Sequence, residues 1–222
     1  MQQIGVLIGK EFRLEWRQRY ALNGMLLYIV STVFVCFLSF SLRRNQLTPM
    51  VWNALFWIIL LFTAINAIAK SFVQERSGRL LYYYTLISPQ KIILSKILYN
   101  TMLMLVLAGL GFSIYTLVMG VPGQDMDMPL FVLNLLLGAV GFAASLTLVA
   151  GIASKAENSA TLMAVLSFPV VLPLLLMLIR VSKNALDGLD RSVSLDEIGT
   201  LLAIDAIVLA LSVMLFPYLW RS

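Results

Sequence analysis

Six long stretches of this 222-residue chain are almost free of charge, and they limit its fold more than any other feature. Five of them contain no charged residue, and the sixth contains only Asp205. Each is at least as long as the roughly 20 apolar residues that an α-helix needs to cross a lipid bilayer. The sequence therefore predicts an all-α integral membrane protein with six transmembrane helices, at about residues 20–42, 49–69, 97–120, 129–153, 159–180 and 198–220.

The remaining composition predicts neither a soluble domain nor an active site. Charged residues make up 12% of the chain, against about 25% in soluble domains. The loops between the runs are short, so we expect one transmembrane domain over residues 1–222. Histidine is absent, and Gly5 and Gly9 are too close together for a phosphate-binding loop. We expect no catalytic residue, no metal site, no directly bound cofactor and no nucleic-acid binding, so ATP hydrolysis would belong to a separate chain.

The distribution of basic residues predicts the orientation in the membrane. Six spans place both termini on one side, and that side would hold eleven of the 16 Lys and Arg residues, the other side five. Loops rich in Lys and Arg stay in the cytoplasm. Both termini are therefore expected to be cytoplasmic.

Residues 2–19 read as an amphipathic helix lying on the membrane surface. Its basic stripe, Lys10, Arg13 and Arg17, lies opposite an apolar arc that includes Phe12 and Trp16. This pattern suits an interfacial helix on an anionic cytoplasmic leaflet. Glu11 interrupts the apolar arc. The helix either serves only as a juxtamembrane anchor or also contacts a cytoplasmic partner.

The fourth and fifth spans contain residues that affect helix packing. Pro169 and Pro173 should weaken the backbone hydrogen bonds of the fifth span and bend it, as a static kink or as a hinge. In the fourth span, small or polar residues share one face, where they suit close packing within the bundle or contact with a second chain: Asn134, Gly138, Gly141 and Ser145.

Asp205 is the one acidic residue inside a predicted span. Such residues are costly in a membrane and usually face the bundle interior or a wet cavity. If the sixth helix begins as late as Gly199, however, Asp205 would lie near the interface and need no special role.

The longest charged interruption, residues 71–96, separates the second and third spans. Ser88-Pro89 predicts a helix start, with Ser88 as the capping residue and Pro89 in the first helical position. The new helix should continue directly into the third span. Before it, residues 78–87 form a short segment in which Leu80, Leu81 and Tyr84 share a face. We expect a cytoplasmic elbow beneath the bilayer that another protein could push; the alternative is that its charges merely keep a loop in water.

These residues resemble the cytoplasmic loop of ABC-2 type transporter permeases, in which an acidic residue, a glycine and a Ser/Thr-Pro pair recur at this spacing. The pattern here is Glu75-Arg76, Gly78, Leu80-Leu81, Ser88-Pro89, Lys91 and Ser95-Lys96. More narrowly, the whole chain is similar to the cytochrome c maturation protein B (CcmB, haem exporter protein B) family. The opening residues 10–17 and Phe72 before the Glu-Arg pair favour that family.

The resemblance implies a permease subunit of an ABC transporter-like complex in the bacterial inner membrane. Its partners would be a CcmA-like ATPase that hydrolyses ATP, CcmC- and CcmD-like membrane subunits and a CcmE-like haem chaperone. Haem would be the cargo of the complex, and the absence of histidine favours a mechanical role over haem binding by this chain. The residues implied to contact the ATPase are those of the elbow: Glu75, Arg76, Gly78, Leu80, Leu81, Tyr84, Ser88 and Pro89.

Two other functions remain compatible with the same residues. One is an ABC-2 permease that exports a different cargo, such as a lipid, a glycan or a drug. The other is a membrane scaffold that organises partner proteins without transport.

Overall fold

The computed structural model of the chain describes residues 2–17, 20–41, 47–73, 88–122, 125–156 and 159–221. Over these residues it forms only helices, and no strand: α1 (Gln2–Arg17), α2 (Tyr20–Ser41), α3 (Pro49–Val73), α5 (Pro89–Met119), α6 (Met128–Ala153), α7 (Ser159–Leu186), the 3-10 helix η1 (Arg191–Ser194) and α8 (Leu195–Arg221). Six of these helices, all except α1 and η1, are long and apolar enough to cross a membrane. The predicted all-α, six-span membrane protein is confirmed.

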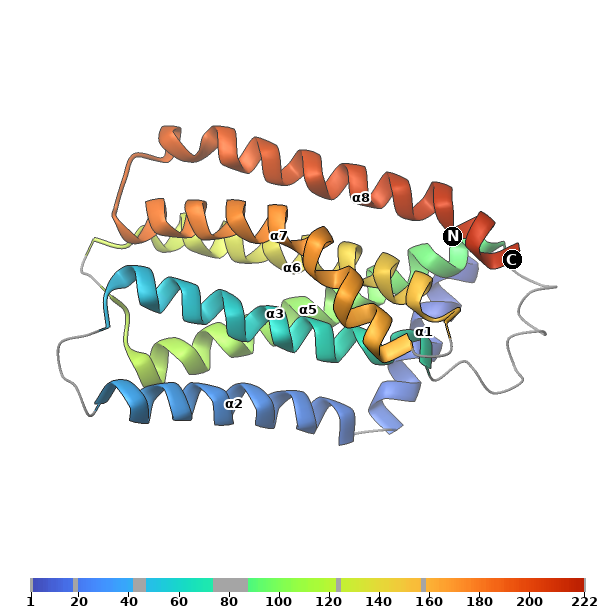
Figure 1. Cartoon of the computed structure of the whole chain (residues 1–222), viewed down its shortest axis with the longest axis horizontal. Coiled ribbons are helices and arrows are strands. Elements are labelled where there is room, and N and C mark those ends of the chain that lie inside the picture. Colours follow the sequence, from blue (N-terminus) through green and yellow to red (C-terminus); the bar gives the residue numbers. More distant parts are fainter. Residues whose placement is uncertain are drawn as a thin grey trace.

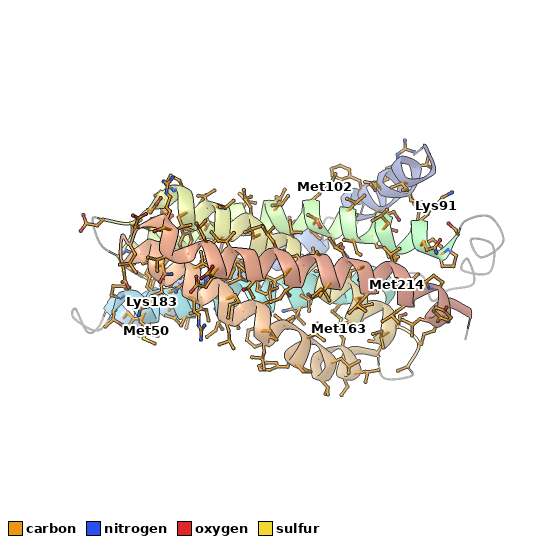
Figure 2. The ribbon with its side chains drawn as sticks, turned by 90° about the horizontal axis from the view of Figure 1, so that it is seen from above. Met50, Lys91, Met102, Met163, Lys183 and Met214 are labelled. Atoms are coloured by element: carbon orange, nitrogen blue, oxygen red, sulfur yellow. The ribbon has the colours of Figure 1, made fainter. Side chains whose placement is uncertain are left out.

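The six long helices run side by side along the long axis of the molecule, and α1 crosses them at one end (Figure 1). The C-terminal end of α8 lies at this same end, which we call the terminal end. Figure 2 shows Lys91 at the terminal end, near α1, and Met50 and Lys183 at the opposite end. Large apolar side chains such as Leu117 and Met214 are exposed on the outside of the bundle. A surface of this kind suits lipid, because soluble monomers rarely expose large apolar patches.

Helix α6 forms the centre of the bundle and packs against α3, α5, α7 and α8. Its small residues allow this close approach. A Cβ atom added to Gly138 would lie 2.9 Å from the Trp57 ring, and one added to Gly141 would lie 2.8 Å from Leu174. The small-residue row predicted in the fourth span is buried throughout, so it serves packing within the bundle.

Polar side chains join α3, α6 and α7 inside the bundle. The indole Nε1 of Trp57 donates a 2.8 Å hydrogen bond to Oγ of Ser182, and Nδ2 of Asn134 donates to the same oxygen at 2.7 Å. Nδ2 of Asn53 donates to the carbonyl of Ile179 at 2.9 Å. Membrane helices gain little from the hydrophobic effect against each other, so such bonds help to hold them together.

Asp127 fixes the opposite end of the bundle. Its carboxylate accepts a 3.2 Å bond from the Leu130 amide at the start of α6, and bonds of 2.6 and 3.0 Å from Nε and Nη2 of Arg191. Hydrogen bonds from Arg191 and Leu130 hold the pKa of Asp127 below its usual range. The connection between α7 and α8 is thereby tied to the start of α6.

Helix α7 is continuous over Ser159–Leu186 although it contains Pro169 and Pro173. It changes direction near its middle (Figure 1). Proline removes a backbone donor and crowds the preceding turn, which is the usual cause of a sharp kink. The predicted bend is confirmed.

Candidate functional site

The elbow predicted between the second and third spans is described only at its end. Glu75, Arg76, Gly78, Leu80, Leu81 and Tyr84 lie outside the described residues, and their roles stay predictions. Helix α5 begins at Pro89 and continues unbroken to Met119. The prediction that a helix starts at Pro89 and runs directly into the third span is confirmed.

Ser88 has the extended backbone expected before proline, with φ −65° and ψ 139°. Its hydroxyl makes no capping hydrogen bond, so the prediction that the Ser88 side chain caps the helix is wrong. The physical reason is that the Lys91 amide, which a capping hydroxyl would accept, donates instead to the backbone carbonyl of Ser88 at 3.0 Å. Pro89, in the first helical position, has no N–H to satisfy.

An ion pair connects α1 to the beginning of α5. Nζ of Lys96 lies 3.5 Å from Oε1 of Glu11, and the Lys96 side chain is only 1% exposed. Lys10 approaches the same Glu11 oxygen at 3.4 Å. Leu7 of α1 is also buried, whereas Phe12 is 59% exposed. Helix α1 therefore packs against α5 through a face that contains both an apolar residue and a carboxylate.

The predicted helix at the N-terminus is confirmed over Gln2–Arg17, and residues 18 and 19 lie outside the described part. Of its predicted basic stripe, Arg13 is exposed and Lys10 is half-buried beside Glu11. Trp16 and Arg17 lie in the last turn of the helix. The position of Glu11 within the apolar arc is explained by its contact with Lys96.

One turn beyond Lys96, α5 is joined to the central helix α6. Nδ2 of Asn100 donates a 2.8 Å hydrogen bond to Oγ1 of Thr147, and both residues are buried. The Thr147 hydroxyl in turn donates to the carbonyl of Ala143. Lys96 and Asn100 are four residues apart, so they share one face of α5. The first turns of α5 are thus connected to α1 on one side and to α6 on the other.

Asp205 lies inside the bundle rather than at its edge. Helix α8 begins at Leu195, which places Asp205 about 15 Å along the helix. Its side chain is buried, and neither carboxylate oxygen has a hydrogen-bond partner among the described residues. A Cβ added to Gly141 would lie 2.5 Å from Oδ1 of Asp205. The interpretation of Asp205 as an interfacial residue is wrong, because the helix starts earlier than Gly199; its position facing the bundle is confirmed.

The described residues contain no group of three or more His, Cys, Asp or Glu side chains that could hold a metal ion. Their chemistry is that of helix contacts, such as the Glu11–Lys96 ion pair, buried hydrogen bonds and the buried carboxyl group of Asp205. The family model for CcmB protein matches residues 2–218. The chain belongs to the CcmB family.

Members of the CcmB family are membrane permease components of the haem-export system for cytochrome c biogenesis. The system is a complex that also contains an ATPase and other membrane subunits. The chain is accordingly a multi-pass transport subunit. No match was found among curated proteins.

Sequence reasoning placed Lys96 in the ABC-2 permease loop pattern but did not pair it with Glu11. The signal was present, because a carboxylate on the apolar arc of an amphipathic helix needs a partner. The Asn100–Thr147 bond carried no comparable signal. Uncharged polar residues are common in membrane helices, and nothing in their spacing shows which helix they face.

Proposed function

We propose that this chain converts ATP hydrolysis on a separate CcmA-like ATPase into movement of its own helices, for haem delivery or for release of the haem-loaded chaperone. The observation that carries this proposal is the start of α5. A membrane-spanning helix begins at Ser88-Pro89 directly after the elbow, and its first turns bind both α1 and α6.

The length of α5 and its contacts with α1 and α6 suit the transmission of a mechanical force from the elbow. An α-helix is a stiff rod, and α5 extends about 46 Å from Pro89 without a break. The Glu11–Lys96 ion pair would draw α1 along with α5. The Asn100–Thr147 hydrogen bond would pass the displacement to α6, which contacts four other helices. The interfacial helix and the bundle core would therefore both respond to a force applied at the elbow.

The orientation follows from the basic residues. In a bacterial inner membrane, the terminal end, with α1 and Lys91, would face the cytoplasm, and the end with Lys183 would face the opposite side. CcmC- and CcmD-like subunits and a CcmE-like chaperone complete the proposed complex. Haem would be cargo of the complex rather than a ligand of this chain, which has no histidine.

Three substitutions in the elbow test the proposal: Glu75→Ala, Gly78→Val and Leu81→Asp. Substitutions in a surface loop usually change stability by about 0.5 kcal/mol or less. Each variant should therefore accumulate in the membrane normally and yet lose cytochrome c maturation. Leu81→Asp should also lose the ATPase on purification. The matched control is Leu189→Asp in an exposed loop at the opposite end, which should retain both.

Normal maturation in all three variants, with no other export activity lost, would reject the elbow as the coupling element. Two further outcomes address the alternatives. If the variants lose an export activity but keep cytochrome c maturation, the cargo is a different one. If an inactivated ATPase still supports full maturation, the chain is a scaffold.

A further inference from the structure

A cleft of about 430 Å³ lies between α2 and α3, apart from the residues assigned to coupling. It is lined mainly by Asn23, Gly24, Leu27 and Tyr28 of α2 and by Thr63 and Asn66 of α3. Asn23 is in the first turn of α2, and Asn66 is one turn before Lys70, the first charged residue after the second span. The cleft therefore lies at the terminal end, where the hydrocarbon core of the membrane gives way to water.

The lining combines apolar surface with uncharged hydrogen-bonding groups. No charged side chain occurs among the described residues that line the cleft. The Thr63 hydroxyl donates to the carbonyl of Ile59 at 2.7 Å, and Nδ2 of Asn66 donates to the carbonyl of Phe62 at 2.9 Å. The oxygen atoms of both side chains can still accept hydrogen bonds, while the amide of Asn23 and the phenol of Tyr28 can donate. These groups suit a neutral ligand whose carbonyl oxygens accept from the donors and whose hydroxyl groups, or water bound to the ligand, donate to the acceptors.

The length of the cleft restricts the occupant. Its lining covers less than two turns of α2, Asn23–Tyr28, and about one turn of α3, Thr63–Asn66. A partner helix packed side by side would contact several turns. Leu27, on the outer side of the cleft, is 67% exposed, so the cleft is open toward the lipid.

We propose that the cleft binds one membrane phospholipid, recognised at its glycerol-ester region. That region lies at the boundary between hydrocarbon and water, as the cleft does. Its ester carbonyls accept hydrogen bonds from Asn23 and Tyr28, and the upper part of an acyl chain covers the apolar wall. Because the described lining is uncharged, the charge of the headgroup has little effect on binding.

Gly24 offers a direct test. A Cβ added there meets no described atom within 4 Å, so Gly24→Leu would place a side chain in the cleft without a clash. Gly109 is equally open and lies on α5, away from the cleft, so Gly109→Leu is the matched control. The probe is a phosphatidylcholine with a photoreactive diazirine next to the glycerol end of one acyl chain. The full chain is reconstituted in phosphatidylcholine vesicles that contain this probe, and the cross-linked peptides are identified by mass spectrometry.

Cross-links of the unmodified chain and of Gly109→Leu should concentrate on residues 23–28 and 63–66. Gly24→Leu should reduce them about tenfold, which corresponds to about 1.4 kcal/mol of binding free energy. When unlabelled phosphatidylglycerol replaces part of the vesicle phosphatidylcholine at a constant fraction of the probe, the amount of cross-linked probe should stay the same. If Gly24→Leu does not accumulate, Asn66→Leu replaces it with the same expectation.

Three results would overturn the proposal. Cross-links spread evenly over the lipid-facing helices would show annular lipid only. Undiminished cross-links at residues 23–28 in Gly24→Leu would show that the lipid does not occupy the cleft. Loss of the cross-links when haem is added would identify the cleft as a cargo site instead.

Discussion

Replacing Glu11 by glutamine should release α1 from the bundle. The substitution keeps the size of the side chain but removes the negative charge beside Lys96, whose side chain is 99% buried in the folded chain. Removing one partner from a buried ion pair costs about 3–5 kcal/mol, because the other charge stays in a poorly solvated place. Glu11 is 14% exposed and Lys96 has an interaction besides this pair, so we take the lower value, about 3 kcal/mol.

A loss of about 3 kcal/mol should raise the population of detached α1 about a hundredfold. Hydrogen–deuterium exchange followed by mass spectrometry measures this directly, in detergent or in lipid nanodiscs. Amides of the peptide that covers Gln2–Arg17 should exchange about a hundredfold faster in Glu11→Gln. Amides of the central helix, Met128–Ala153, should be unchanged, because α1 does not pack on α6 to any large extent.

Two further variants separate the ion pair from simple loss of charge. Lys10→Gln also removes a charge near Glu11, but Lys10 is more exposed, and such pairs contribute about 0–1 kcal/mol. Adding Lys96→Met to Glu11→Gln removes both buried charges and should restore most of the protection, since an apolar replacement of a buried pair is often neutral. Exchange of Glu11→Gln at the wild-type rate, or no recovery in the double variant, would refute the reasoning.

Three other predictions concern the core, the opposite end and haem. Gly141→Ala should lower the thermal stability by about 1–3 kcal/mol, because its Cβ would meet Asp205, whereas Gly109→Ala should be tolerated in the same melting assay; equal melting temperatures would contradict the close packing. Asp127→Asn should melt at a lower temperature than wild type at neutral pH. The lowered pKa of Asp127 means that stabilisation by Arg191 is present above the usual carboxyl pKa and is lost as the pH falls through the lowered value, so the difference should vanish in acid; a constant difference down to low pH would argue against the pair. The chain purified alone in detergent should show no stoichiometric haem absorbance, and a one-to-one haem complex that survives washing would contradict the mechanical role.

The sequence alone determined the fold class and the ends of several helices. Uncharged runs long enough to cross a bilayer leave a chain few choices, because an unpaired backbone group is too costly in lipid and a helix satisfies all of them locally. Proline acts equally locally: Pro89 begins α5, and Pro169 and Pro173 lie in the bent helix α7. The start of α5 and the bend of α7 were therefore predictable without knowing which helices are neighbours.

Only the tertiary structure decided which polar residues meet. Glu11 and Lys96 are far apart in the sequence, and their contact depends on how α1 crosses α5. The depth of Asp205 depends on where α8 begins, which is Leu195. Its burial depends on Gly141 of α6, because a side chain at that position would collide with the Asp205 carboxylate. Helix hydropathy could not reveal these pairs, because almost every face of such a helix is apolar, whether it meets lipid or protein. The partner of a polar residue is set by helix packing, and packing is a property of the whole bundle.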